Sequence, residues 1–552
     1  MKEFLQSVFL FDPANPLIFT RFFFWGFFAV VLVFYSLIYK NKSLRNVYLF
    51  AISLFFYYKT GGFFLFILIF STLTDYGIGI AIGSSAREVN KKLWLALSIF
   101  LNLGVLVFFK YDYFFTETFN SVFKTNLEVV NHAASWSNAL FGTHFDLGKM
   151  LPPVGISFFT FQTISYSVDV YRGLVKPVKN LADFGFYVSF FPQLVAGPIV
   201  RAAEFIPQLY KDYKLTYYEF GLAFYFILKG LTKKMLIGDY LAVNLIDRVF
   251  SNPASYSGFE NLSALFGYSM QVYCDFSGYT DIAIGVALLM GFHLPVNFNS
   301  PYKARNVGDF WKHWHMSLSS WLKDYLYIPM GGNRSATGFT YISLTVVLMF
   351  VILLTAKLIV IPIILVAVAG VWLLTRVFPS IKTGVTTNIN LMMTMLLGGL
   401  WHGSSWMFVV WGGLNGLGLL VYKGWKKISP YEHSTHWLVN AWRIALTFTF
   451  ITFTRIWFRG ESMQGTFDLL RQIGTNFGWE ALPEMVTNYW KSLSMLAFGL
   501  VLHWLPEPIK NIGRNWFIRC PLYQKIIVSF LIVFIIYQSV SASLTPFIYF
   551  QF

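Results

Sequence analysis

Residues 383–422 read TGVTTNINLMMTMLLGGLWHGSSWMFVVWGGLNGLGLLVY, and His402 is the only side chain among them that titrates near neutral pH. A straight α-helix of this length would extend about 60 Å, twice the hydrocarbon thickness of a bilayer. The stretch must therefore fold back or break, and the glycine-rich segment 398–405 is the natural place. Non-helical backbone at membrane depth is tolerated only where protein or a watery cavity surrounds it. We therefore expect His402 at a helix break that lines an internal cavity or its mouth.

The composition of the chain is that of a membrane protein. Of 552 residues, 12% are charged and 56% are hydrophobic, and aromatic residues alone make up 20%. Soluble proteins carry about 25% charged residues, so this chain could not cover a soluble surface. The same figures exclude a disordered, collagen-like or coiled-coil protein. The sequence therefore predicts an all-α polytopic membrane protein.

Two cysteines and a net charge of +16 limit the kinds of partner. The cysteines are too few for a disulfide framework or a Cys-rich metal site, and we expect no metal and no tightly bound cofactor. The cationic residues lie in short clusters between apolar runs, as the positive-inside rule places them. No basic stripe with interleaved aromatics indicates nucleic-acid binding. Membrane lipids are the expected surroundings of this chain.

Apolar runs that could cross a bilayer recur along the whole chain. They lie at 17–39, 46–60, 62–83, 93–109, 152–170, 184–200, 219–237, 262–292, 340–356, 358–377, 391–422 in two pieces, 438–458, 493–506 and 525–546. These runs predict roughly a dozen helices, several of them too short or too polar to cross simply. Lys40, Lys42 and Arg45 follow the first run, so the positive-inside rule places them in the cytoplasm and the N-terminus on the extracytoplasmic side. We expect no cleavable signal peptide, because the first run is too long.

Ionisable residues inside such runs are usually turned inward, because lipid exposure is costly. Asp75 lies next to Gly79-xxx-Gly83, a spacing typical of closely packed helices. An interhelical hydrogen bond is the simpler interpretation of this aspartate. Tyr273, Asp275 and Asp281 fall within one otherwise apolar run, which favours a cavity lining over a lipid-facing surface.

The segment 309–325 reads as an amphipathic helix with one histidine on its apolar stripe. At 3.6 residues per turn, His315 shares a face with Trp311 and Trp314, whereas His313 points away by about 200°. Taken alone, His315 is either a packed core histidine or a functional one. The same two interpretations apply to His402.

Signatures of other enzyme classes are missing from the sequence. We find no Walker loop, no Gly-x-Ser-x-Gly elbow and no His-Glu-x-x-His motif, so an ATPase, a serine hydrolase or a zincin is not indicated. Most of the nine histidines lie in polar loops and are expected to be solvated surface residues. Lys303 and Arg305 could meet phosphates or could anchor the chain at the membrane surface.

Several motifs, in this order along the chain, resemble the membrane-bound O-acyltransferases. The matching segments are 153–162, 169–173, 191–198, 273–282, 297–305, 310–319, 324–329, 331–334, 394–403 and 546–552. Within that family they are most similar to the membrane subunit of alginate O-acetylation, and more distantly to the membrane protein of teichoic-acid D-alanylation. The resemblance covers nearly the whole chain.

The resemblance implies one membrane domain over residues 1–552, built as a ring of tilted and re-entrant helices around a thinned centre with a tunnel. It identifies His402, in the Leu-Trp-His-Gly motif, as the active-site histidine and His315 as its companion. Side chains in or near these motifs would contact the substrate or the donor: Tyr273, Asp275, Asn299, Lys303, Arg305, Trp311, Lys312, Trp314 and Trp401. The cations Lys303, Arg305 and Lys312 are candidates for CoA phosphates.

Two features depart from the family pattern. The two histidines are 87 residues apart (402 − 315), a longer connection than in the alginate branch, and the excess is the apolar stretch 339–378. This stretch predicts an inserted transmembrane hairpin with its turn near Lys357, on the extracytoplasmic side. The segment 110–150 is also less family-like, which leaves the acceptor open.

The function that the resemblance implies is O-acetylation of a bacterial cell-surface polysaccharide from the inner membrane. A thioester, acetyl-CoA, would be the cytoplasmic donor. The acceptor would be the glycan or a serine on an extracytoplasmic partner protein. Two other classes stay open: a transporter or flippase with a proton relay formed by Asp75, Asp275, Asp281 and His402, and an acyltransferase of lipids or proteins.

Overall fold

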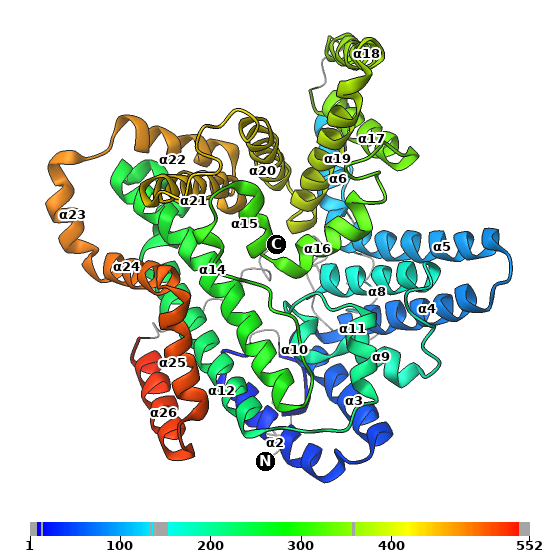
Figure 1. Cartoon of the computed structure of the whole chain (residues 1–552), viewed down its shortest axis with the longest axis vertical. Helices are drawn as coiled ribbons and strands as arrows, with labels where there is room; N and C mark the ends of the chain where they lie inside the picture. The colour runs from blue at the N-terminus through cyan, green and yellow to red at the C-terminus, as the bar shows by residue number, and fades with distance from the viewer. Residues whose placement is uncertain are drawn as a thin grey trace. The chain divides into compact units, whose positions relative to one another are not determined.

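The computed structural model consists of α-, 3₁₀- and π-helices (Figure 1), and no strand occurs among the residues that it describes. These residues are 8–12, 15–129, 131, 135, 138–139, 153–355 and 359–539. Five helical stretches in this part of the chain are long and apolar enough to cross a membrane: Lys42–Ser84, Glu88–Phe123, Gly258–Leu289, Val360–Val377 and Leu522–Ser539. The prediction of an all-α polytopic membrane protein is therefore confirmed, whereas the ring and the tunnel stay predictions.

The chain divides into two compact units. The first is formed by the described residues of 1–102, 153–318 and 435–551. Its longer helices are α2 (Phe22–Ile38), α3 (Lys42–Gly61), α4 (Leu65–Ser84), α5 (Glu88–Leu106), α8 (Ile156–Tyr171), α12 (Tyr217–Leu231), α14 (Gly258–Leu289), α21 (Trp437–Arg459), α22 (Met463–Thr475), α24 (Trp490–Trp504), α25 (Glu507–Arg519) and α26 (Leu522–Ser539). Shorter helices connect them: α9 (Leu181–Ser189), α10 (Phe191–Leu194), α11 (Ala202–Leu209), α13 (Asp247–Ser251), α15 (Val307–His313), α16 (Met316–Leu322) and α23 (Leu482–Asn488).

The second unit is formed by the described residues of 103–152 and 319–434. Its helices are α6 (Asp112–Phe123), α17 (Gly338–Thr355), α18 (Val360–Val377), α19 (Pro379–His402) and α20 (Trp406–Trp425). Two π-helices belong to it, η2 (Val107–Tyr111) and η7 (Lys323–Tyr327). Such helices are rare and are often found at functional sites.

Helix α14 is the central element of the first unit, since its apolar window is buried along its entire length. It packs against α12, and glycines form the contact between the two helices. A Cβ at Gly230 of α12 would lie 2.5 Å from the carbonyl oxygen of Gly278 of α14, and a Cβ at Gly278 would lie 2.7 Å from the carbonyl oxygen of Gly230. A Cβ at Gly285 would come within 2.6 Å of the carbonyl oxygen of Ala223. Only glycines allow two helix backbones to approach this closely.

Asp75 forms the interhelical contact expected from the sequence. Its carboxylate accepts hydrogen bonds from Ser98 Oγ (2.5 Å) and Asn102 Nδ2 (2.6 Å) of α5, and from Ser167 Oγ (3.0 Å) of α8. The spacing of glycines beside it also has the expected effect, because a Cβ at Gly79 would lie 2.6 Å from the Tyr166 ring. The prediction of an interhelical hydrogen bond is confirmed.

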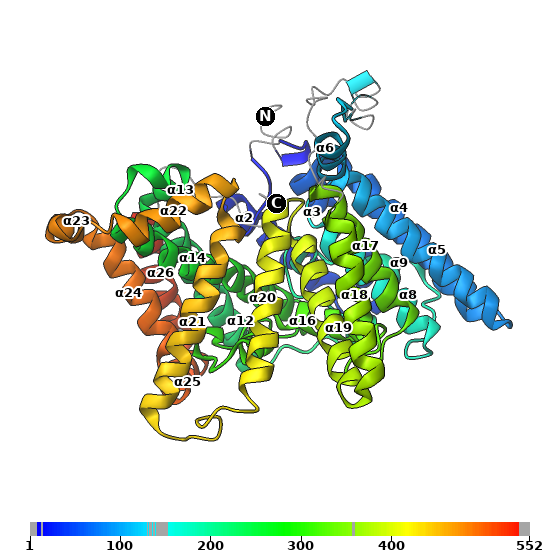
Figure 2. The same cartoon turned by 90° about the horizontal axis from the view of Figure 1, so that it is seen from above.

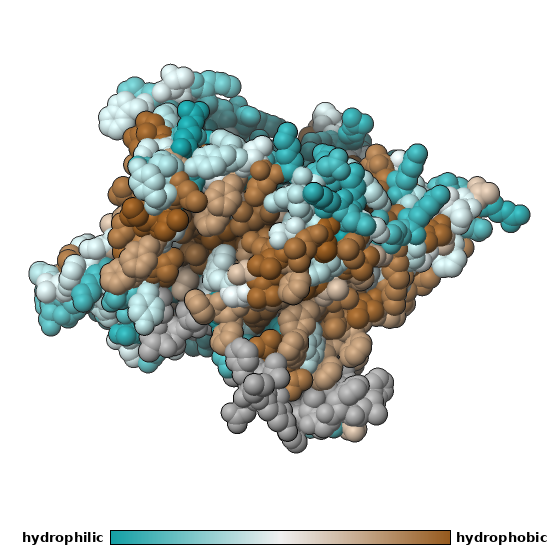
Figure 3. Space-filling model, turned by 90° about the horizontal axis from the view of Figure 1, so that it is seen from below, coloured by the Kyte–Doolittle hydropathy of each residue, from teal (hydrophilic) through white to brown (hydrophobic). Residues whose placement is uncertain are grey.

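The apolar stretch 339–378 contains α17 and α18, which pack against each other and against α19 (Figure 2). The spanning window of α18 has no buried residue, as expected of a helix surrounded by lipid. On the face of the molecule shown in Figure 3, apolar side chains cover a broad area. Lys357, the expected turn, lies outside the described residues, and the insertion and its topology stay predictions.

Replacing Gly278 by Ala should destabilise the protein by about 1–3 kcal/mol, because the new Cβ would press into the backbone of α12. Gly77→Ala is the matched control, since a Cβ there meets nothing within 4 Å and alanine is the better helix former. Thermal denaturation of the two purified variants in detergent measures the difference. Equal melting temperatures would contradict the close packing of α12 on α14.

Candidate functional site

His402 is the last residue of α19, and α20 starts at Trp406, after a three-residue linker. The two helices lie side by side (Figure 2). The break predicted within 398–405 is therefore confirmed. The side chain of His402 is 4% exposed, so the histidine is buried at this break. A cavity beside it stays a prediction.

Glycines allow the sharp turn after α19. A Cβ at Gly399 would lie 2.4 Å from the carbonyl oxygen of Phe408, and a Cβ at Gly412 would lie 2.4 Å from that of Met395. In the linker, a Cβ at Gly403 would overlap the Phe408 ring at 2.0 Å. Side chains at these three positions would push α20 away from α19. The glycine-rich sequence thus determines where the break occurs and how closely the chain returns.

A lysine that the sequence analysis missed caps this end of α19. Lys110 Nζ donates to the carbonyl oxygens of Trp401 (2.7 Å) and His402 (3.2 Å), and the Tyr111 hydroxyl donates to that of Leu400 (2.7 Å). The last carbonyls of a helix have no partner within the helix, and the negative end of its dipole favours a cation. The sequence signal was a lysine directly after the apolar run 93–109.

The imidazole of His402 stands edge-on to two indoles. Its centroid is 4.9 Å from the ring of Trp401 and 5.1 Å from that of Trp411, with interplanar angles of 77° and 85°. T-shaped contacts of this kind fix the plane of a ring and shield it from water. A fixed and shielded imidazole is suited to exchange a proton with one bound hydroxyl group. Trp401, a predicted substrate contact, thus touches the active-site candidate itself.

The helix predicted over 309–325 is interrupted at its centre, so this prediction is wrong. Helix α15 ends at His313, and α16 begins at Met316. Between them, His315 has a φ of 44°, in the left-handed region that residues other than glycine rarely adopt. Helical periodicity therefore cannot assign this histidine to a face. Strained backbone of this kind persists where the surroundings impose it, and it clusters at functional sites.

Asn297, from the loop after α14, imposes this conformation. Its backbone carbonyl accepts from Met316 N–H (2.9 Å), and its Oδ1 accepts from Ser317 N–H (3.0 Å) and Ser317 Oγ (2.9 Å). His315 Nδ1 lies 3.3 Å from the same Oδ1. Because this amide oxygen can only accept, Nδ1 carries the proton, and Nε2 of the neutral ring presents a lone pair.

His315 lies in an aromatic cage and is 0% exposed. The ring of Phe276 meets it edge-on at 4.6 Å, and the rings of Phe158 and Phe298 lie 6.4 Å away. Burial lowers the pKa of His315 to about 3, because an imidazolium in this cage would lose its hydration. The ring is therefore neutral at physiological pH.

Trp314 packs on a buried arginine that the sequence analysis missed. Arg455, on α21, is 4% exposed, and its guanidinium carbon lies 4.6 Å from the centroid of the Trp314 ring and 5.1 Å from that of Tyr302. Its Nη1 donates to the Tyr302 hydroxyl (2.5 Å). Cation–π contacts are strongest where both groups are desolvated. Arg455 therefore holds in place the residue that precedes His315.

The other predicted contacts differ in where they lie. Tyr273 is buried, with its ring 6.5 Å from that of Trp314, and Asp275 pairs with Lys234 (2.5 Å). Asn299, Arg305 and Lys312 are exposed, whereas Lys303 and Trp311 are half-buried. Tyr273 therefore belongs to the group of aromatic residues around Trp314, whereas Asn299, Arg305 and Lys312 lie at the surface. The role of each stays a prediction.

His503, on α24, is a buried histidine that the sequence analysis did not single out. It is 4% exposed, its Nε2 accepts from Tyr302 N–H (3.1 Å), and its ring lies 4.6 Å from that of Tyr273. A histidine within the apolar run 493–506 was the available signal. In the described part of the chain, no group of three or more His, Cys, Asp or Glu side chains could hold a metal ion.

Comparisons with known proteins match the sequence of this chain to a family. A family model described as MBOAT, membrane-bound O-acyltransferase family, matches residues 178–354, which include His315. The chain is 33% identical to a protein of Pseudomonas aeruginosa described as a probable alginate O-acetylase, AlgI, over 89% of this chain and 81% of that protein.

Two further relatives carry related names. A peptidoglycan O-acetyltransferase of Helicobacter pylori is 32% identical over 79% of this chain and 75% of that protein. A teichoic acid D-alanyltransferase of Bacillus subtilis is 28% identical over 58% of this chain and 71% of that protein. All three names describe acyl transfer. The chain is an acyltransferase and belongs to the membrane-bound O-acyltransferase family.

Proposed function

We propose that this protein is an O-acetyltransferase of a cell-surface polysaccharide, located in a bacterial inner membrane. Relatives named for O-acetylation of alginate and of peptidoglycan support this reaction class. The observation that carries the proposal is the buried His402 at the break between α19 and α20, in a chain that aligns with most of an alginate O-acetylase.

The proposed donor is acetyl-CoA, which reaches the enzyme from the cytoplasm without being bound as a cofactor. His402 removes the proton of an acceptor hydroxyl while the hydroxyl oxygen attacks the acetyl carbonyl carbon. A C–O ester bond forms and the C–S bond breaks. The leaving thiolate then takes the proton from His402 and departs as the CoA thiol, so the histidine returns to its neutral form. General base catalysis of this kind contributes about 10²–10⁴-fold.

His315 would orient the donor or stabilise the oxyanion, and its contact with Asn297 bears on which of these two roles it has. Stabilising an oxyanion requires a hydrogen-bond donor aimed at the developing charge. Nδ1 carries the only proton of the neutral ring, and that proton faces Asn297 Oδ1. The other nitrogen, Nε2, can only accept. The geometry therefore favours positioning over the oxyanion-stabilising role that is the alternative for this histidine.

The acceptor belongs to the extracytoplasmic side in this proposal. It is either the polysaccharide itself or a serine of an extracytoplasmic partner protein that passes the acetyl group on. The extracytoplasmic N-terminus that the positive-inside rule predicts is part of the same proposal.

A proton relay, as in a transporter, has less support. Asp75 is fully engaged by hydroxyl and amide donors, and Asp275 is paired with Lys234. Asp281 is held by two lysines, Lys229 (3.0 Å) and Lys233 (2.8 Å). These contacts give each of the three carboxylates a role in holding neighbouring helices together, and that role accounts for them without a proton pathway.

His402→Ala should reduce acetyl transfer to about 1% or less, because the variant lacks the group that removes the hydroxyl proton. The measurement is transfer of labelled acetyl from acetyl-CoA by the protein in proteoliposomes. His433→Ala, at an exposed histidine, is the control and should retain full activity. Normal purification of His402→Ala with full activity would contradict the base assignment.

His315→Ala should lose most activity and His313→Ala little. His315 fills the aromatic cage, whereas His313 is half-exposed and its Nδ1 contacts the carbonyl oxygen of Asp309 on its own helix (2.8 Å). The same transfer assay compares both variants, and KM for acetyl-CoA is measured with kcat. Equal losses at the two positions would show that the cage has no specific role.

A further inference from the structure

Five cations from separate parts of the chain gather in the first unit, and we call them the basic cluster. They are Lys229 of α12, Lys233 of the π-helix η3 (Thr232–Asp239), Lys303 of the 3₁₀-helix η6 (Pro301–Lys303), and Lys510 and Arg514 of α25. Glu507, Lys510 and Arg514 are spaced by three and four residues, so they lie on one face of α25. Close packing of α12 on α14 brings the lysines of α12 and η3 against Asp281.

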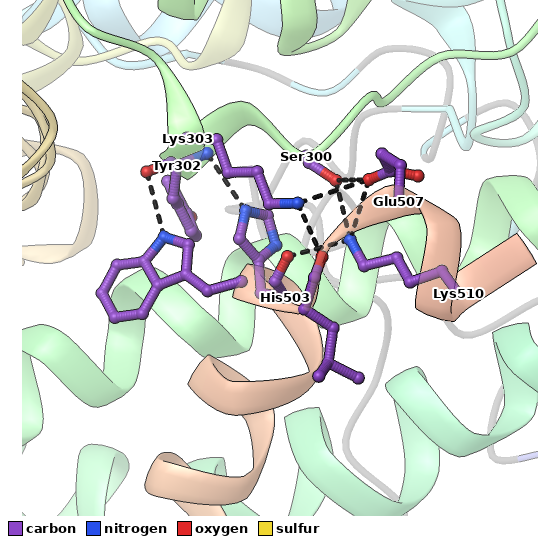
Figure 4. A network of polar contacts seen from close by, with 8 residues as sticks. Ser300, Tyr302, Lys303, His503, Glu507 and Lys510 are labelled. Atoms are coloured by element: carbon purple, nitrogen blue, oxygen red, sulfur yellow. Dashed lines mark hydrogen bonds and ion pairs between the residues drawn. The ribbon is translucent and has the colours of Figure 1, made fainter. Parts of the chain in front are cut away.

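One half of the basic cluster surrounds Glu507 (Figure 4). Lys303 Nζ (3.4 Å), Lys510 Nζ (3.1 Å) and Ser300 Oγ (3.1 Å) all lie close to the same oxygen, Oε1. Two ammonium groups thus share one carboxylate. The side chains of Lys303 and Lys510 are 28% and 25% exposed, so a solute can reach them.

The other half surrounds Asp281. Here too, two ammonium groups, those of Lys229 and Lys233, share one carboxylate. The two halves are neighbours. Tyr273 and His503 lie between them: Lys233 Nζ is 5.0 Å from the centroid of the Tyr273 ring, and the His503 ring is 4.6 Å from that ring. Lys510 Nζ donates to the backbone carbonyl of His503 (2.9 Å). Helices α12 and α25 also pack against each other, because the Tyr225 ring of α12 lies 5.9 Å from Lys229 Nζ and 6.2 Å from the Phe517 ring of α25.

The basic cluster carries more positive charge than its carboxylates balance. The basic cluster contains five cations and two carboxylates, Asp281 and Glu507, an excess of three positive charges (5 − 2). Next to the cluster, Lys234 pairs with Asp275 and Asp239, so that group has a net charge of −1 (1 − 2). The cluster and this group together therefore have an excess of two positive charges (3 − 1). Partly desolvated cations are stable when an anion compensates them. A ligand with at least two negative charges fits this balance.

Unused hydrogen-bond donors point to the same kind of ligand. An ammonium group has three N–H bonds, and among the described residues Lys229 donates to Asp281 alone, while Lys303 donates to the Leu505 carbonyl and Glu507. Arg514 Nε is buried and has no acceptor in the described part of the chain. Phosphate oxygens are strong acceptors for ammonium and guanidinium groups.

The basic cluster adjoins the aromatic residues next to His315. Lys233 Nζ lies 5.0 Å from the centroid of the Tyr273 ring, and that ring lies 6.5 Å from the ring of Trp314. The C-terminal end of α14 contacts the loop after α11, because the Tyr213 hydroxyl donates to the Leu289 carbonyl (3.1 Å). In that same loop Asp212 pairs with Lys42 (2.9 Å), which the positive-inside rule places in the cytoplasm.

We propose that the basic cluster binds the phosphate groups of the acetyl donor and so fixes the end of the molecule remote from the thioester. This inference rests on the proposed function, because acetyl-CoA is the phosphorylated substrate of that reaction. It assigns a site to Lys229, Lys233, Lys510 and Arg514, and it retains Lys303 from the sequence-based candidates. Arg305 and Lys312 are exposed and lie outside it.

The test is binding of CoA to the purified full chain in phosphatidylcholine nanodiscs, measured by isothermal titration calorimetry. Lys303→Gln and Arg514→Gln should each weaken CoA binding roughly tenfold, since each removes a charge-assisted contact to phosphate. Pantetheine, which has no phosphate, should bind wild type and variants equally. Lys491→Gln and Arg471→Gln, at exposed cations, are the matched controls and should bind CoA like the wild type.

Unchanged CoA affinity in both cluster variants would overturn the proposal. The proposal would also be overturned if the basic cluster binds the phosphate of membrane lipids. In that case, nanodiscs of phosphatidylglycerol would abolish CoA binding by the wild type and not by the variants. Lys303→Arg, which keeps the charge, should restore affinity if folding is intact. Acetyl transfer is measured in parallel to separate the phosphate site from the proposed function. If the wild type transfers acetyl and both variants bind CoA as tightly as the wild type, the phosphate site alone is overturned. If the wild type neither binds CoA nor transfers acetyl, both claims are overturned.

Discussion

Every backbone group that leaves a helix inside a membrane protein needs a partner, because lipid offers none, and this constraint shapes the surroundings of both histidines. At the end of α19, Lys110 and Tyr111 bind the carbonyls of residues 400–402. Between α15 and α16, Asn297 replaces the missing helical contacts. Each histidine is thus buried at a chain break that other segments of its own unit hold in place.

The sequence allowed prediction of features that depend on local pattern and length. The break after His402 followed from a run too long for one helix, and the contact of Asp75 followed from the cost of a carboxylate in lipid. The break at His315 was not predictable, because the amphipathic period continues through it and the group that imposes it, Asn297, comes from another segment. Lys110, Arg455 and His503 were missed for a similar reason: their partners lie far away in the sequence.

The chemistry proposed here divides the work between a proton acceptor and a binding surface. In this proposal, the His402 imidazole between its two indoles exchanges one proton, and the basic cluster binds the phosphates of the donor through charges that its two carboxylates do not balance. Phosphate binding far from the reacting carbonyl would orient the thioester without taking part in the bond changes. Such remote binding energy is useful to an enzyme whose acyl group is as small as acetyl.

Product analysis of the purified protein tests the central claim most directly. The protein is reconstituted in proteoliposomes with a polysaccharide inside, and labelled acetyl-CoA or palmitoyl-CoA is added outside. The account predicts an acetyl ester on the acceptor, release of CoA in equal amount, and little reaction of the longer thioester. No ester from either thioester, together with dissipation of an imposed pH gradient, would contradict acyl transfer and favour a transporter.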